Sequence, residues 1–461
     1  MIPIDALPDD VLLSIFDFYM VNQDSFGRKQ KRAVEAWQAL VHVCRRWRSV
    51  VFGSPRRLNL QLSFGSGTSG DMLEVWPALP LLISASVYQD DADNIAVALE
   101  RSDRVVEIRL DIHEGPALTK VFAAMHVPFP ELTSLRIWSW SATMGTVLPD
   151  SLLGGSTPRL RSLDLHRIPL PVFPKPLLSA THLINLHLTD IPHSAYISPE
   201  AMVTALSALN SLERLSLRFQ SPQSRPDRES RRPPLPTRFV IPVLTFLNFK
   251  GDNGYIDDLV ACIDAPRLNN LNITFFNQIV FDTRQFMQFI SRTPGLKALE
   301  KARVTFGDNI SEGTASVSLS SRTSGNGKLE VNVRCNEFDW QVSSMEQVCS
   351  SCLPPLSTLE DLYIVGGSQQ SDRQDNIEDA LWLELLHPFT TVKNLYLSAG
   401  FAPHIVHALQ ELVGGRAAEV LPTLQNIFLE RPRSWGPVLE GIGKFLAARQ
   451  GSIAVSMWEG L

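Results

Sequence analysis

The chain has 461 residues, 44% hydrophobic and 20% charged, which is typical of a folded protein with a large core. A formal net charge of −6 argues against bulk electrostatic binding of nucleic acid. No stretch approaches the roughly 18 apolar residues of a membrane span, the start lacks the basic segment of a signal peptide, and five cysteines make no disulfide framework. We therefore expect a protein of the cytoplasm or the nucleus with reduced thiols.

The first 55 residues predict a small helical domain. Pro8 suits a first helical position, and the two aspartates that follow suit the positive end of the helix dipole. Four apolar residues then fall at helical spacing and predict one apolar stripe: Leu12, Ile15, Phe16 and Tyr19. After a polar, basic segment over 21–32 the spacing restarts at Trp37. It predicts a second helix that passes through Cys44 and Trp47 and stops at Gly53 and Pro55.

The runs LPDDVLLSIF and LVHVCRRWRSVV resemble the F-box motif, with its Leu-Pro-acidic opening, its Ile-Phe pair and its later Val-Cys-basic-basic-Trp. The resemblance implies docking on the Skp adaptor of a cullin-RING (SCF) ubiquitin ligase. Under it, the adaptor-facing and core residues are Leu7, Pro8, Ile15, Phe16, Val43, Cys44 and Trp47. The segment 20–36 is longer and more basic than the family's usual connection. A plainer interpretation, in which these helices only cap a repeat domain, stays open.

From residue 57 onward one pattern recurs, called the leucine phrase here: an apolar residue, two or three other residues, and then Leu-x-Leu or a near equivalent. The middle residues of the clear copies are Ile108, Leu135, Leu163, Leu186, Leu215, Leu247, Leu271, Leu362, Leu395 and Ile427. A degenerate copy at Leu299 and a copy at 329–333 fill the long gap, and strands at 58–62 and 81–83 begin the array. Most steps fall within or just above the leucine-rich-repeat length of about 20–29 residues.

These repeats predict an α/β solenoid of about 12–13 irregular repeats over residues 56–461, with a parallel sheet on its concave face. Helical spacing between the copies appears near Pro199, Phe286, Trp382 and Ile405. The array resembles the leucine-rich-repeat domains that follow F-boxes in many eukaryotic proteins, including large fungal sets. The asparagine or cysteine that regular repeats carry after the last leucine is replaced, so we expect no regular asparagine ladder.

Two segments interrupt the series of leucine repeats. Residues 220–238 are rich in proline, serine and arginine, and residues 307–328 are rich in glycine, serine and threonine. We expect both to be mobile surface loops.

Chemistry is sparse. Gly65, Gly67 and Gly70 follow an apolar strand, with Asp90 twenty residues on, as in a dinucleotide-binding motif. Pro77 leaves too few residues for the helix that such a site needs, so we do not expect one. The Cys349-x-x-Cys352 pair lacks a second ligand pair nearby, so we expect neither zinc nor another cofactor. No nucleophile-and-base motif appears, and we expect no enzyme.

Residues between the leucines point to the solvent face of the sheet, where a protein target is expected to bind. The large aromatic ones there are Trp138, Tyr363 and Tyr396. The favoured hypothesis is a substrate receptor of an SCF-type ligase. The alternative is a non-catalytic repeat scaffold with a non-functional F-box.

Overall fold

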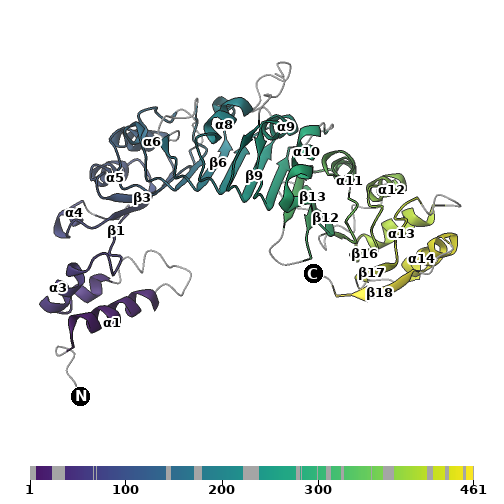
Figure 1. Ribbon diagram of the computed structural model, residues 1–461, viewed down its shortest axis with the longest axis horizontal. Helices are drawn as coiled ribbons and strands as arrows, with labels where there is room; N and C mark the ends of the chain where they lie inside the picture. Colours follow the sequence, from purple (N-terminus) through teal and green to yellow (C-terminus); the bar gives the residue numbers. More distant parts are fainter. Residues whose placement is uncertain are drawn as a thin grey trace. The chain divides into compact units, whose positions relative to one another are not determined.

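The computed structural model describes residues 7–22, 37–65, 67–68, 70–141, 147–170, 179–221, 238–276, 281, 283–297, 299–307, 313–322, 327–354, 356–366, 378–412, 419–430, 436–449 and 453–459. The chain divides into two compact units, residues 1–186 and 187–461. The predicted domains, 1–55 and 56–461, do not follow this division and stay a prediction. Both units are mixed α/β (Figure 1). Within the described ranges, no helix is long and apolar enough to cross a membrane.

The first unit starts with helices and continues into a parallel sheet. Its helices are α1 (Asp9–Asn22), residues 37–41, α3 (Arg45–Gly53), α4 (Met72–Val75), α5 (Ala92–Leu99), α6 (Gly115–Ala124) and the 3-10 turn η3 (Leu152–Gly155). Its strands are β1 (Leu62–Phe64), β2 (Leu81–Val87), β3 (Val105–Ile112), β4 (Ser134–Ser139) and β5 (Ser162–His166). Each strand pairs in parallel with the next, and Ile108, Leu135 and Leu163 form one buried column across them.

The N-terminal helices differ from the prediction in two ways. The second helix is broken, because Cys44 is extended (φ −157°, ψ 170°) and its Sγ accepts a hydrogen bond from the Trp47 N–H. Cys44 therefore caps α3 instead of continuing a helix. The predicted stripe on α1 is also split, since Leu12 and Phe16 are buried while Ile15 and Tyr19 are exposed.

A tryptophan joins this helical segment to the start of the sheet. Trp37 is fully buried, its Nε1 donates to the Gln61 carbonyl at 2.9 Å, and its ring lies 5.1 Å from that of Trp76. The first predicted strand is shorter than expected: residues 55–59 form turns, and β1 begins only at Leu62.

The second unit has more elements of the same kinds. Its helices are η4 (His193–Ala195), α8 (Pro199–Leu206), α9 (Asn253–Ala261), α10 (Arg284–Arg292), η6 (Pro294–Leu296), α11 (Phe338–Gln347), the π-helical turn η7 (Val348–Cys352), α12 (Asp379–Leu386), α13 (Ala402–Gln410) and α14 (Gly436–Arg449). Its strands are β6 (Asn185–Ile191, which spans the division), β7 (Arg214–Phe219), β8 (Phe239–Val240), β9 (Phe246–Gly251), β10 (Ile263–Asp264), β11 (Asn270–Phe275), β12 (Lys301–Gly307), β13 (Thr314–Ser320), β14 (Lys328–Arg334), β15 (Asp361–Gly366), β16 (Asn394–Leu397), β17 (Asn426–Glu430) and β18 (Ala454–Trp458).

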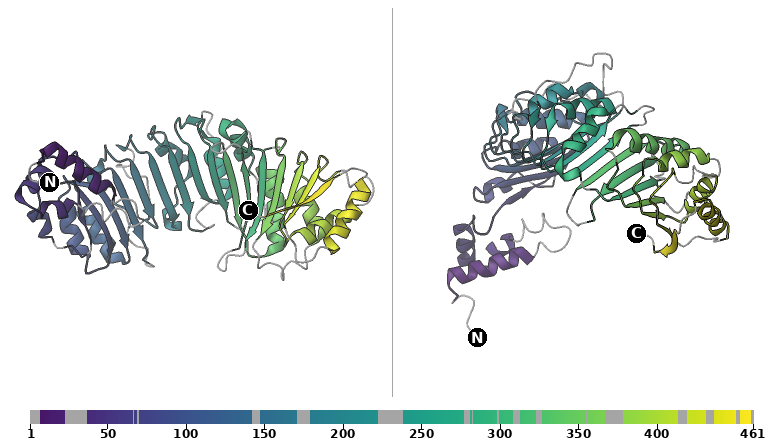
Figure 2. Two further views of the ribbon diagram at one scale, coloured as in Figure 1. Left: turned by 90° about the horizontal axis from the view of Figure 1, so that it is seen from below. Right: turned by 45° about the vertical axis from the view of Figure 1, so that its right-hand side comes forward.

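The main sheet of this unit runs β7-β9-β11-β14-β13-β12-β15-β16-β17-β18, while β8 and β10 form a separate pair. Helices α9 to α13 lie along one side of its strands (Figure 1), and Figure 2 shows the strands as one row. The helices predicted near Pro199, Phe286, Trp382 and Ile405 are confirmed as α8, α10, α12 and α13. Leucines of neighbouring strands form columns, such as Leu215, Leu247, Leu271 and Leu329.

The prediction of a parallel sheet fails at one place. Strands β12, β13 and β14, called the reversed block here, stand in reverse chain order, with β14 beside β11 and β12 beside β15. Within the block, β13 pairs antiparallel with both β12 and β14. β13 lies within residues 307–328, so the mobile loop predicted there is wrong over residues 314–320. Its polar residues alternate with buried Ala315, Val317 and Leu319, and this period of two makes a strand of a segment whose composition indicates a loop. The other predicted loop, 220–238, falls almost wholly on residues outside the described ranges.

Candidate protein-interaction surfaces

Three of the seven residues assigned by the F-box resemblance serve the helical segment itself. Phe16 is fully buried, and its ring centroid lies 4.8 Å from that of Trp47. Cys44 caps α3, as described above. An ion pair between Asp9 and Arg46, 2.7 Å long, holds the start of α1 against α3. These contacts position the outer surface of α1.

The other four residues are accessible to a partner in different degrees. Ile15 is 42% exposed and Val43 is 59% exposed, whereas Pro8 is exposed and Leu7 is half-buried, with its carbonyl accepting from Arg46. Besides Ile15 and Tyr19, which belong to the predicted stripe, the structure exposes Val11 and Phe18, which the sequence did not single out. We call the following set the α1 apolar face: Val11, Ile15, Phe18 and Tyr19.

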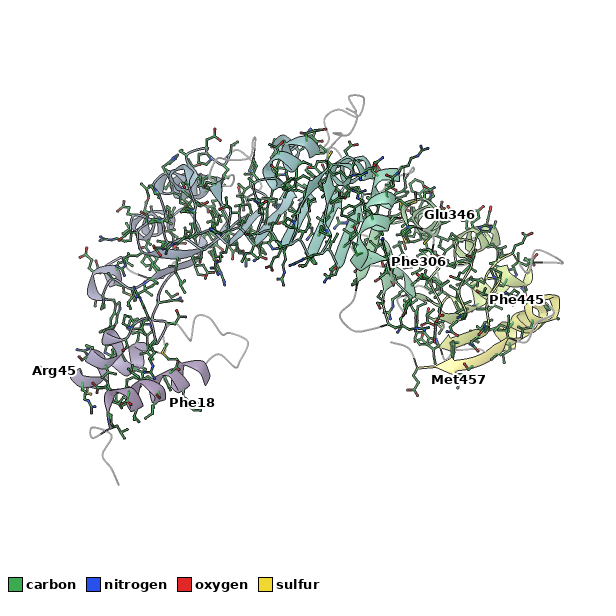
Figure 3. All side chains as sticks on the ribbon, in the orientation of Figure 1. Phe18, Arg45, Phe306, Glu346, Phe445 and Met457 are labelled. Carbon is green, nitrogen blue, oxygen red and sulfur yellow. The ribbon has the colours of Figure 1, made fainter. Side chains whose placement is uncertain are left out.

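The α1 apolar face groups four exposed apolar residues on one helix. Phe18 has 72% of its area exposed (Figure 3), and Val11, Ile15 and Phe18 follow each other at spacings of four and three. The signal was present in the sequence, because α1 carries more apolar residues than one stripe can hold. A helix with apolar residues on both sides is typical of a surface that another molecule covers.

A second surface lies on the sheet of the first unit. Trp138 and His166 are in register on β4 and β5, with ring centroids 5.4 Å apart. Trp140, just after β4, is 46% exposed and lies 5.3 Å from His166. The guanidinium of Arg136 stacks 3.5 Å from the centre of Trp138. The predicted Trp138 is therefore half-buried, and the missed Trp140 offers the larger exposed area.

The third surface is on the second unit. Tyr363 and Tyr396 are in register and stack at 4.2 Å, and Phe428 continues the stack at 4.4 Å from Tyr396; we call these three the tyrosine stack. Trp458 packs edge-on against both tyrosines, and Arg303 lies 5.7 Å from the centre of Tyr363. Burial raises the pKa of the Tyr363 phenol to about 12, and the neighbouring Tyr396 adds to the rise.

A polar ladder runs beside the tyrosine stack. Asn426 Nδ2 donates to Asn394 Oδ1, and Asn394 Nδ2 donates to Asp361 Oδ1, both at 2.7 Å. Arg322 donates to the other oxygen of Asp361 through Nε (3.3 Å) and Nη2 (3.0 Å). This short ladder forms at the residue just before the Leu-x-Leu of each phrase, and not at the position after it where regular repeats carry an asparagine.

The motifs of small-molecule chemistry form no assembled site in the described parts of the chain. After the glycine motif, α4 has four residues, and the chain enters β2 six residues later. Cys349 and Cys352 are both buried, in a π-helical turn and without a disulfide, and burial raises the pKa of Cys352 to about 12. In the described residues, no group of three His, Cys, Asp or Glu side chains has the arrangement of a metal site.

Comparison with known proteins gives little. No protein-family model matches the sequence, and no curated protein matches it. Among solved structures, the chain is similar to the crystal structure of the leucine-rich repeat-containing protein LegL7 from Legionella pneumophila, at 11% identity and a TM-score of 0.28, over 84% of this chain and 98% of that one. The mixed α/β repeat architecture rests on this chain's own evidence, the columns of leucines across its paired strands.

Proposed function

We propose that this chain is a non-catalytic substrate receptor of an SCF-type ubiquitin ligase. Its N-terminal helices dock on the Skp adaptor, and the aromatic residues of its sheets bind a protein target in the cytoplasm or the nucleus. The receptor acts by holding the target near the ligase's catalytic partner, which raises the effective concentration of the target lysine. It needs no cofactor of its own.

The observation that carries the proposal is the α1 apolar face. It lies within the segment whose residues resemble the F-box, and Ile15, which the resemblance assigns to the adaptor, is part of it. Val43, also assigned to the adaptor, is 59% exposed in the turn before α3. Exposed aromatic and aliphatic residues grouped on one helix are the usual anchors of a protein interface.

A binding measurement with purified Skp adaptor tests the docking. Ile15→Asp is expected to weaken binding by roughly 30-fold, because burying an aspartate against an apolar surface costs about 2 kcal/mol. Val97→Asp is the matched control, since Val97 on α5 is 43% exposed, close to the 42% of Ile15. Equal binding by the two variants, or no binding by the wild type, contradicts the adaptor role.

The second candidate function is a repeat scaffold that binds partners without a ubiquitin ligase. It is favoured by the internal use of Phe16, Cys44 and Trp47, which any small helical segment packed at the start of a repeat array requires. The adaptor measurement separates the two. If the chain is only a scaffold, the wild type does not bind the adaptor but still binds its target through Trp140 or the tyrosine stack.

A further inference from the structure

The outer strand of the second unit has an open edge. β18 pairs with β17 on one side, and none of the described strands pairs with its other side. Natural proteins usually protect such edges with charges, prolines or bulges. β18 has the sequence AVSMW and contains no charged residue and no proline.

The hydrogen-bonding phase of β18 shows which residues face this edge. The Ala454 N–H donates to the Gln425 carbonyl at 2.9 Å, on the β17 side. In a parallel ladder the residues that bond to one neighbour alternate with those that face the other way. Val455 and Met457 therefore direct their backbone N–H and C=O groups to the open edge.

The side chains of the same two residues are also uncovered. Val455 and Met457 are in register with Ile427 and Leu429, which are at most 1% exposed. Yet Val455 is 37% exposed and Met457 is 57% exposed (Figure 3), and Leu439 of α14 is 48% exposed. Core positions are thus occupied by apolar residues that the described chain covers only in part, which is typical of an interface.

We propose that two copies of this chain associate through β18, paired antiparallel about a twofold axis at Ser456. This axis places Val455 opposite Met457 of the second copy, and both residues have edge-facing backbone groups, so they form hydrogen-bonded pairs. Apolar side chains then meet apolar side chains. The exposed Glu459 falls opposite Ile453 rather than its own copy, so no like charges face each other.

The pairing continues the sheet of one copy into that of the other. The tyrosine stacks of the two copies then lie on the same face of one sheet, since a sheet keeps its two faces across a new strand pair. A dimer would present two target surfaces at once, which raises avidity for a target with two binding segments. The pairing does not depend on adaptor docking.

The association state of the intact chain tests the interface. Sedimentation across a range of protein concentrations is expected to show a species of twice the chain mass, which the double variant Val455→Lys, Met457→Lys abolishes. Val240→Lys is the control, because Val240 on β8 is 48% exposed and away from β18. A monomer at every concentration, or a dimer that survives the two lysines, overturns the proposal.

Cysteine cross-linking tests the register without charging the edge. The background is Cys44→Ser, which keeps an N-cap side chain, and the other four cysteines are buried. Ser456→Cys is expected to form an intermolecular disulfide, because its two copies face each other at about 4.5 Å between Cα atoms. Ala454→Cys should not, because its copies lie about 13 Å apart. Equal cross-linking of the two variants overturns this register.

Discussion

The side chain of Tyr363 is placed so that ionisation disturbs the tyrosine stack. An unfolded tyrosine has a pKa near 10, whereas burial and Tyr396 raise that of folded Tyr363 to about 12. The folded state therefore holds the phenol proton more tightly than the unfolded state. Its contribution to stability is complete below about pH 10 and is lost as the pH rises toward 12.

We expect the wild type to lose more thermal stability between pH 9 and 11.5 than Tyr363→Phe, which has no proton to lose. Thermal melts followed by circular dichroism measure this difference. Tyr88→Phe, at an exposed tyrosine outside the tyrosine stack, is the matched control. The same pH dependence in all three proteins would contradict burial of the Tyr363 phenol.

Asp361 is the residue on which the polar ladder ends. Its carboxylate is 5% exposed and accepts from both Asn394 and Arg322. Asp361→Ala should cost about 2 kcal/mol, because a donor to a buried charged acceptor loses its partner. Asn426→Ala, at the far end of the ladder, should cost about 1 kcal/mol. Urea unfolding measures both, and an equal or smaller loss for Asp361→Ala contradicts the ladder.

The position of a single residue was predictable where its place in the leucine phrase fixes which face of the sheet it occupies. Tyr363 and Tyr396 occupy the same position of two phrases, and the structure stacks them. Trp458 was missed because β18 contains no leucine, and the partner of Arg322 was missed because Asp361 lies 39 residues away. The role of the aromatic residues in target binding stays a prediction.

Among the elements, β13 is where composition and structure disagree. If residues 314–320 form a strand between β12 and β14, successive backbone amides bond alternately to these two neighbouring strands, and none is left to solvent. Hydrogen–deuterium exchange should then be as slow in this segment as in 301–307. The tip of a loop would exchange within the shortest measured time. Val317→Asp, which places a charge in the buried column, should speed exchange across all three strands.

The elements that the sequence predicted correctly are those whose apolar spacing clearly matches either the helical period of 3.6 residues or the strand period of two. Helices α10, α12 and α13 show helical spacing, and strands β3 to β7 carry the leucine phrase. The break at Cys44 was missed because the apolar spacing continues through it, while the cap depends on the local backbone. The order of β12, β13 and β14 was missed because spacing along a chain does not show which strand pairs with which.

At the scale of the whole chain, the reactivity of the five thiols shows whether the buried core of the repeats opens to solvent. Four cysteines are buried and Cys44 is half-buried, and burial raises the pKa of Cys335, Cys349 and Cys352. A buried, protonated thiol reacts slowly with disulfide reagents. At pH 8 the native chain should therefore react quickly at no more than one thiol, and at all five in denaturant. Cys44→Ser should remove the fast reaction, and a second fast thiol would show that a buried repeat opens.

The reversed block has a consequence for synthesis of the chain. In the regular part of the array a strand meets its partner about 30 residues later, as Asn394 meets Asn426. β11 instead pairs with β14, and Asn270 meets Lys328. At about 5–20 residues per second, ribosomes take roughly 3–12 s to supply that partner. During this interval the nascent chain carries an unpaired, apolar strand edge. β12 waits about as long for β15, because Lys301 meets Asp361, so among the described strands β11 and β12 give a chaperone the most time to bind.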